Sequence, residues 1–185
     1  MSKPKIILPD TSPLIHLAAV GALSVLNQLG SVVVADMVVY EAIGDLSKPW
    51  ASEIAAWIEE GTREGSNAPI MVEQTEIGET FRLALETDPQ HRMPNAGENA
   101  IIDWLGTKAE THEAIVVYEN GRVPEAIRRQ GFNADISVVT TRAFLALAEL
   151  EGVIESGDAL WKKIETAAPT INHANQTTVI RRTDS

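Results

Sequence analysis

The segment KIILPDTSPLIHL, residues 5–17, joins a short apolar run to an acid, two hydroxyls and a proline. The run at 6–8 is typical of a buried strand, and Ser12 followed by Pro13 is typical of a helix N-cap and first turn. Asp10 lies between the two, at the end of the predicted strand. A buried carboxylate is costly unless other groups compensate its charge, so the rest of the chain must supply neighbours for Asp10.

The same alternation of short apolar runs and helical segments continues along the chain. Further strands are predicted at 32–34, 70–72, 115–117 and 136–139, and their solidly apolar character indicates burial on both faces. Helical spacing predicts helices at 13–29, 37–43, 49–60, 77–86, 97–110, 123–130, 140–150 and 157–166. This order predicts an α/β protein, a three-layer α/β/α sandwich with a central parallel sheet of four to five strands.

Composition limits the organisation and compartment of the protein. We expect one domain over residues 1–166 and a polar, flexible C-terminal tail at 167–185. The chain has no cysteine, which excludes disulfides and thiolate metal sites. No apolar run approaches the roughly 20 residues that span a bilayer, and the N-terminus lacks signal-peptide features. We therefore expect a soluble cytoplasmic protein without a membrane partner. The net charge of −11 argues against indiscriminate binding to nucleic-acid backbones, but not against an enzyme whose acids hold cations.

Several acids are predicted to reach the carboxyl edge of the sheet, where ligands of open parallel sheets bind. Asp10 follows the first strand, although a turn or capping role is the alternative. Glu98 shares a helix face with the apolar positions 101, 102 and 105, so it should face the sheet in the first helical turn. Attraction to the helix dipole is its alternative explanation.

Two further acids have less distinctive positions. Glu41 lies in a short helix that Asp36 can cap, and it is either part of the site or a partly exposed helix residue. Glu119 ends the fourth predicted strand, where Asn120 and the next glycine are also a plain turn signal. Two other acids are expected to be solvated, Asp45 and Asp103, and Asp135 is expected at the opposite edge of the sheet.

The proximity of such acids would determine their chemistry. Two carboxylates 4 Å apart repel by about 4 kcal/mol at an effective dielectric of 20, so they stay ionised only with cations among them. Oxygen ligands without thiolates favour Mg²⁺ or Mn²⁺. Such an ion can activate water and stabilise the transition state at a phosphate, which makes phosphodiester hydrolysis the natural reaction.

Five segments together resemble the PIN-domain ribonucleases, and most closely the toxin components of bacterial toxin–antitoxin pairs. They are DTSPLIHLAAVGALSVL (10–26), VVVADMVVYEAI (32–43), GENAIIDWL (97–105), VVYENGR (116–122) and VVTTRAFLALAELEGVI (138–154). The resemblance covers most of residues 5–155 and depends on the order and spacing of the segments. It implies endonucleolytic cleavage of single-stranded RNA with Mg²⁺ or Mn²⁺, by attack of water on phosphorus.

The resemblance also implies roles for particular residues. The catalytic acids are Asp10, Glu41, Glu98 and Glu119, and the metal ligands are Asp10, Glu98, Glu119 and Asn120. Supporting hydrogen bonds from helix starts are expected from Ser12, Thr140 and Thr141. The family usually has one or two aspartates where this chain has Glu119 and Asn120. The amide lowers the negative charge of the site, which predicts that a second metal binds weakly or only with substrate.

Other classes fit the sequence less well. A haloacid-dehalogenase-like phosphotransferase needs an aspartate where Ser12 stands, and a phospho-receiver domain needs a lysine at the end of the last strand. The remaining competitor is a PIN-like interaction module without nuclease activity.

The expected partners are an RNA substrate, a cognate antitoxin and a second copy of the chain. An arginine-bearing antitoxin segment would suit an acidic cleft in a protein of this charge. Arg122 and Arg142 are candidate contacts to the RNA backbone, with a solvated helix face as the alternative for each. The histidines show no ligand spacing, and His16 is expected to pack among apolar helix residues. The four tryptophans are expected to build the core or a contact within a homodimer.

Overall fold

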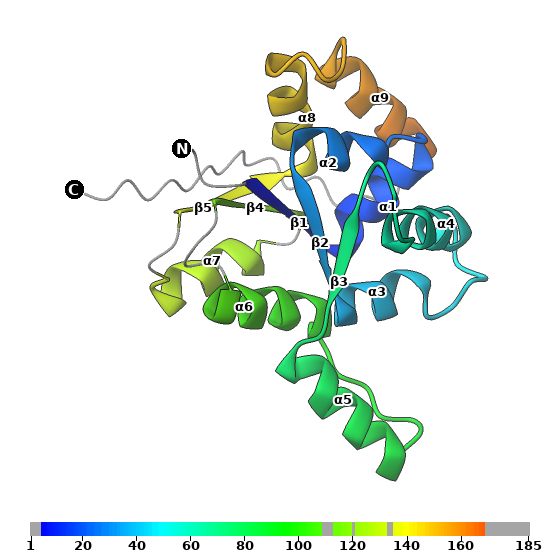
Figure 1. Ribbon diagram of the computed structural model, residues 1–185, viewed down its shortest axis with the longest axis vertical. Helices are drawn as coiled ribbons and strands as arrows, with labels where there is room; N and C mark the ends of the chain where they lie inside the picture. Colours follow the sequence, from blue (N-terminus) through cyan, green and yellow to red (C-terminus); the bar gives the residue numbers. More distant parts are fainter. Residues whose placement is uncertain (1–4, 109–112, 120, 133–134, 169–185) are drawn as a thin grey trace.

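The computed structural model describes residues 5–108, 113–119, 121–132 and 135–168. Its centre is a five-stranded sheet in which all strands are parallel and follow the order β3-β2-β1-β4-β5 (Figure 1). The strands are β1 (Lys5–Pro9), β2 (Ser31–Ala35), β3 (Ile70–Glu73), β4 (Glu113–Tyr118) and β5 (Asp135–Thr140). The predicted α/β class and parallel sheet are confirmed, and β1 lies in the middle of the sheet.

Helices cover both faces of this sheet and complete the three layers (Figure 1). The helices are α1 (Thr11–Ala19), α2 (Ser24–Leu29), α3 (Asp36–Ile43), α4 (Ala51–Thr62), α5 (Glu76–Thr87), α6 (Ala96–Lys108), α7 (Arg122–Gln130), α8 (Thr141–Leu150) and α9 (Gly157–Ala167). In Figure 1, α2, α8 and α9 lie on one side of the sheet, and α6 and α7 lie on the other. Helix α5 extends away from the sheet beyond the end of β3.

The single helix predicted at 13–29 was wrong, because the structure has two helices there. Helix α1 ends before Gly21, which adopts a left-handed backbone with φ of 66°. The Gly21 N–H donates to the Ala18 carbonyl at 3.0 Å, and the Ala22 N–H donates to the Leu17 carbonyl at 2.8 Å. These bonds satisfy carbonyls at the end of α1 and turn the chain, as glycine-terminated helices commonly do.

The expected capping role of Ser12 was also wrong. Helix α1 begins at Thr11, and Asp10 occupies the N-cap position with an extended backbone and no capping hydrogen bond from its side chain. Ser12 therefore lies inside the first turn. The helix starts directly after the strand, so Asp10 is held between two rigid elements.

Continuous burial explains why the strands are solidly apolar. Ile7, Leu8, Val32 and Val116 in the three central strands have no exposed surface, and burying one such side chain contributes about 1.5–3 kcal/mol. The tryptophans belong to this core as well. Trp104 and Trp161 are buried, whereas Trp50 and Trp57 are partly buried and pack against the core.

The last helix ends one residue beyond the end predicted for it at 166. Helix α9 continues through Ala167, and Ala168 is still buried. The predicted flexible tail otherwise lies outside the described residues. Among the helices of the described ranges, none has the length and apolar character that crossing a membrane would require.

Candidate active site

Asp10 lies directly beyond the central strand, at the carboxyl edge of the sheet. Its N–H donates to the Val117 carbonyl of β4 at 2.8 Å, which extends the sheet by one residue. The side chain is only 5% exposed. The pKa of Asp10 is raised to about 7, mainly by burial and less by the nearby carboxylates of Glu98, Glu41 and Glu119, while a hydrogen bond from the Thr11 backbone opposes the rise. The structure thus brings the three other predicted acids close enough to act on Asp10.

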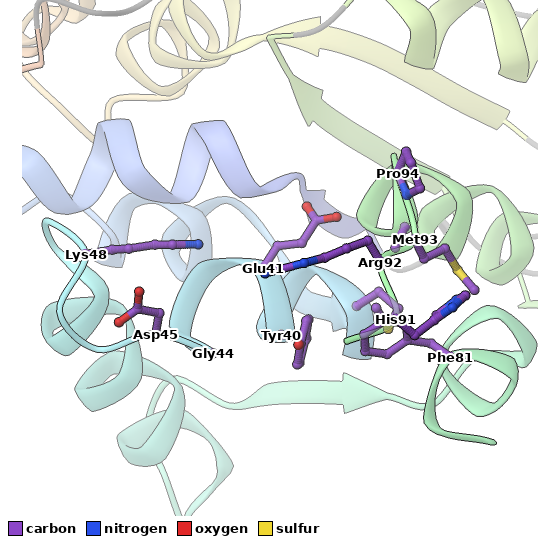
Figure 2. A pocket seen from close by; sticks show the side chains of 12 residues that line it. Tyr40, Glu41, Gly44, Asp45, Lys48, Phe81, His91, Arg92, Met93 and Pro94 are labelled. Carbon is purple, nitrogen blue, oxygen red and sulfur yellow. The ribbon is translucent and has the colours of Figure 1, made fainter. Parts of the chain in front are cut away.

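Glu41 connects three helices through its carboxylate. Its Oε2 atom accepts a hydrogen bond from the Thr11 hydroxyl at the start of α1, at 3.0 Å. Its Oε1 atom accepts from the Gly97 N–H in the first turn of α6, at 2.9 Å. Glu41 therefore fixes the start of the helix that carries Glu98, and it also lines a cavity of about 480 Å³ (Figure 2).

The Gly97 position is closely packed against this carboxylate. A Cβ atom added there would lie 2.8 Å from Glu41 Oε2 and 3.3 Å from a methyl group of Val38. Both contacts are tighter than ordinary van der Waals separations. A larger residue at this position would therefore displace the Glu41 carboxylate from the start of α6.

Glu98 is partly buried in the first turn of α6. The apolar face predicted for it is present in part, since Ile101 and Leu105 are buried and Ile102 is partly buried. Glu98 also lines a second cavity, of about 470 Å³, which it shares with Arg122 of α7.

Glu119 follows β4 and contacts two helices. Its Oε1 atom accepts a hydrogen bond from the Thr141 N–H at the start of α8, at 3.0 Å. The same atom lies 3.5 Å from Nδ1 of His16, which is buried and packs edge-on against Trp161. At that separation the His16 nitrogen makes no aligned hydrogen bond, and in the described part of the chain Nδ1 has no other partner. The predicted ligand Asn120 lies outside the described residues.

Of the residues expected to hydrogen-bond the site from helix starts, Thr141 contacts Glu119, whereas Thr140 caps its own helix. Thr140 is the N-cap of α8 and accepts from the Ala143 N–H at 3.2 Å. Thr141 reaches Glu119 through its backbone, while its hydroxyl is buried without a partner among the described residues. No side-chain hydrogen bond of Ser12 occurs within the described ranges, whereas its neighbour Thr11 donates to Glu41.

The two candidate arginines occupy different surroundings. Arg142 forms an exposed ion pair with Asp158 at 2.9 Å, which ties α8 to α9. Arg122 donates to the Asn95 side chain at 3.0 Å, directly before α6 begins. Asn95 has a left-handed backbone with φ of 58°, and it lines the same cavity as Glu98. Of the two, Arg122 is therefore the one beside a predicted site acid.

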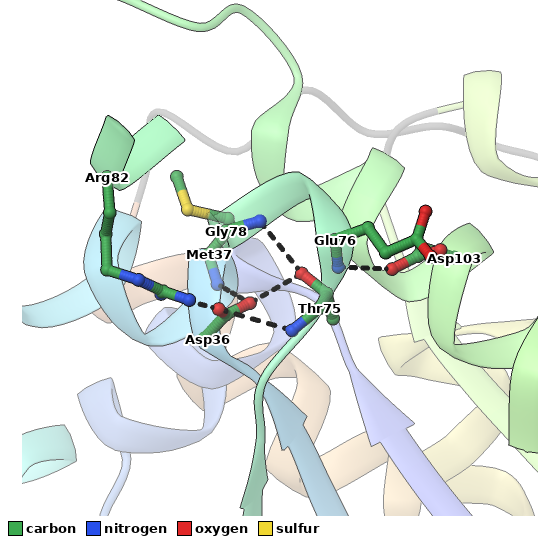
Figure 3. A network of polar contacts seen from close by, with 7 residues as sticks. All are labelled: Asp36, Met37, Thr75, Glu76, Gly78, Arg82 and Asp103. Atoms are coloured by element: carbon green, nitrogen blue, oxygen red, sulfur yellow. Dashed lines mark hydrogen bonds and ion pairs between the residues drawn. The ribbon is translucent and has the colours of Figure 1, made fainter. Parts of the chain in front are cut away.

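Asp36 and Asp103 belong to a separate network that holds α5 (Figure 3). Asp36 is buried and accepts hydrogen bonds from the Met37 N–H, the Thr75 hydroxyl, the Thr75 N–H and Arg82, over distances of 2.7–3.3 Å. Asp103 accepts from the Glu76 N–H at 2.8 Å. Asp103 is partly exposed, as expected of a surface acid, and it also caps the start of α5.

The donor set suits a hard cation, although the acids are not arranged as a finished metal site. Carboxylate oxygens are the ligands that Mg²⁺ and Mn²⁺ prefer, and a cation would offset the cost of the charge on Asp10. In the ranges that the structure describes, no group of three or more histidine, aspartate or glutamate side chains could hold an ion as it stands. Glu41 and Glu119 instead bind backbone and hydroxyl groups, but each carboxylate oxygen has capacity for a further contact.

Three contributors to the site were missed from the sequence. Thr11 could have been noticed as a hydroxyl beside Asp10, and Gly97 as a small residue in the first turn of a helix. His16 gave no signal, because its contact with Glu119 depends on how α1 packs against β4.

Comparison with protein-family models and with curated proteins gives no match. The resemblance to PIN-domain ribonucleases thus remains a prediction from the quoted segments.

Proposed function

We propose that the protein is a metal-dependent endoribonuclease that hydrolyses phosphodiester bonds of single-stranded RNA. The observation that supports this most directly is the surroundings of Asp10. This carboxyl group is buried at the end of the central strand, and three further carboxylates raise its pKa. A divalent cation would stabilise the ionised form of all four groups.

In this proposal, Asp10, Glu98 and Glu119 hold Mg²⁺ or Mn²⁺ together with Asn120. The bound ion would supply an activated water and would offset charge on the phosphate that is attacked. Glu41 is a positioning residue in this proposal. Its carboxylate accepts a hydrogen bond from the Gly97 N–H, which fixes the start of α6 and hence the place of Glu98. Arg122, which lines the same cavity as Glu98, would contact the RNA backbone.

The same proposal includes the partners that the resemblance implies. A cognate antitoxin would place an arginine among these carboxylates, because a charge-assisted pair with a buried carboxylate is stronger than an exposed one. A homodimer remains part of the proposal and can be measured by sedimentation.

The test is RNA digestion during a Mn²⁺ titration. We expect cleavage by the wild-type chain that a chelator abolishes and that falls below detection in Asp10→Asn and Glu98→Gln. Both variants keep the side-chain shape, so thermal melting should show an intact fold. Glu59→Gln is a matched control, since Glu59 is exposed on α4 and lines neither of the two cavities.

Two outcomes would count against the proposal. Cleavage that persists in both variants and in the presence of chelator would assign the activity to something other than this site. A wild-type chain that binds RNA or protein but never cleaves with Mn²⁺ would favour the interaction module.

A further inference from the structure

The cavity beside Glu41 combines aromatic rings with positive charge. It lies between α3 and the segment that leads into α6, and it has a volume of about 480 Å³, within the range of small-ligand sites (Figure 2). The side chains that matter for its chemistry are Tyr40, Glu41, Asp45, Lys48, His91 and Arg92.

Tyr40 offers a fixed aromatic surface. Its side chain is 48% exposed, although it sits on a helix that packs against the core. The ring meets buried Phe81 edge-on with centroids 4.8 Å apart, and Phe81 in turn contacts the His91 ring at 5.9 Å. Phe81 thus holds the Tyr40 ring in place while leaving part of it open to the cavity.

Two cations enter the cavity from opposite sides. Figure 2 shows the side chains of Lys48 and Arg92 pointing toward each other from opposite sides. Within the described part of the chain, neither side chain has an ion pair or a hydrogen bond. Two unpaired cations in one cavity are unexpected in a chain with a net charge of −11.

The two acids of the cavity already have partners. Glu41 accepts from Thr11 and Gly97. Asp45 accepts from the hydroxyl and the N–H of Ser47, and these bonds are the main reason that its pKa is lowered, with Lys48 making the smallest contribution. Lys48 and Arg92, which have no such partner among the described residues, and the exposed ring of Tyr40 are therefore the groups best placed to bind a ligand.

We propose that this cavity is a subsite for one nucleotide of single-stranded RNA. The base stacks on Tyr40, and Lys48 and Arg92 contact the flanking phosphates. Stacking surfaces combined with basic side chains are the general means by which single strands are bound without sequence preference. The inference rests on the proposed function, because it places the nucleotide next to Glu41 and hence beside the scissile phosphate.

An arginine-bearing protein segment fits this cavity less well. Its positive charge would be attracted by Asp10 and the neighbouring carboxylates, but it would be repelled by Lys48 and Arg92. RNA phosphates are attracted by Lys48 and Arg92, and their repulsion from the carboxylates would be offset by the divalent cation of the proposed site.

The binding test uses the full chain with Asp10→Asn, in chelator, so that cleavage cannot interfere. Fluorescence anisotropy measures affinity for a labelled 12-nucleotide single-stranded RNA of mixed sequence. Tyr40→Ala should weaken binding by roughly fivefold or more, and Tyr40→Phe should preserve it. Lys48→Gln and Arg92→Gln should each weaken binding and make its salt dependence shallower by about 0.7 in log–log slope. Lys162→Gln, at an exposed position of α9, should change neither the affinity nor the salt dependence.

A second measurement locates the base that stacks on Tyr40. The same RNA is prepared with one abasic nucleotide at each position in turn. At one position the abasic substitution should weaken binding to the protein that keeps Tyr40. The same substitution should cause no further loss of affinity in Tyr40→Ala, because the stacking contact is already absent there. If the loss of affinity from the abasic nucleotide and the loss from Tyr40→Ala are additive at every position, no base stacks on Tyr40. This holds even where Tyr40→Ala alone weakens binding.

The outcomes separate this inference from the nuclease proposal. Loss of affinity in the Tyr40 and cation variants supports the subsite whether or not Mn²⁺ produces cleavage. Unchanged affinity in Tyr40→Ala, Lys48→Gln and Arg92→Gln overturns the nucleotide subsite, even where Mn²⁺-dependent cleavage is present. A protein segment would then be the better candidate for the cavity.

Discussion

The carboxylate of Glu41 and the backbone of Gly97 are joined by a hydrogen bond of 2.9 Å, which ties α3 to the first turn of α6. The two residues are 56 positions apart in the chain. A carboxylate at the N-terminus of a helix is stabilising, because it is attracted by the helix dipole and accepts a hydrogen bond from an N–H that has no partner within the helix. The position of Glu98, one residue further along α6, therefore depends on a residue of a different helix.

Gly97→Ala should reduce activity without unfolding the protein. The new Cβ would lie 2.8 Å from Glu41 Oε2, so the carboxylate has to move and its bond to the α6 backbone lengthens. Because residues that orient metal ligands typically contribute 10- to 100-fold, we expect Mn²⁺-dependent cleavage to fall by roughly that factor. Single-turnover digestion measures the loss, and thermal melting checks the fold.

Gly106→Ala is the matched control on the same helix. Its Cβ would meet only a ring carbon of Phe132 at 3.4 Å, an ordinary contact. Replacing a helix-interior glycine should stabilise the protein by about 0.5–1 kcal/mol and leave cleavage unchanged. If the two variants cleave equally well, the position of Glu41 has no influence on the reaction.

Gly78→Ala should destabilise the protein at the network around Asp36. A Cβ at Gly78 would lie 1.8 Å from Asp36 Oδ2, and that carboxylate cannot move easily because four hydrogen bonds hold it. We expect a loss of about 1–3 kcal/mol in the free energy of unfolding, measured in urea. Gly121→Ala should stay within about 0.5 kcal/mol, since a Cβ there meets nothing within 4 Å. Equal stability of the two variants would mean that the hydrogen bonds of Asp36 rearrange around the new methyl group with no loss in the free energy of unfolding.

The parallel sheet could be predicted because its strands are buried on both faces and read as unbroken apolar runs. The break between α1 and α2 was missed because Gly21 lies in an apolar segment that keeps a helical pattern across it. The delivery of Asp10 to the carboxyl edge followed from strand direction alone. By contrast, the cap that Asp103 gives to Glu76 joins residues 27 positions apart, and no local pattern reports such a contact.

The two arginines singled out from the sequence should behave differently toward RNA. Arg142 pairs with Asp158 on the surface, and exposed pairs contribute little, so Arg142→Gln should change stability by less than about 1 kcal/mol and leave RNA affinity unchanged. Arg122 borders the cavity that contains Glu98. Arg122→Gln should therefore weaken RNA binding and lower its salt dependence by about 0.7 in slope. Anisotropy at several salt concentrations distinguishes them, and equal behaviour would remove Arg122 as a substrate contact.

Asp10 should make the metal-free protein less stable as the pH rises. Its pKa is about 7 in the folded chain against 3.8 ordinarily, so the folded state binds this proton more tightly than the unfolded state. The resulting stability is complete below about pH 4 and is lost as the pH rises through 7, by roughly 4 kcal/mol at most. Asp10→Asn cannot ionise, so it should match the wild type at pH 4 and exceed it at pH 8 when urea unfolding is measured in chelator. Mn²⁺ should stabilise the wild type most at pH 8, where the carboxylates are charged, and should have little effect on the variant. Parallel stability curves for the two proteins from pH 4 to 8 would mean that burial does not raise the pKa of Asp10 in the folded chain.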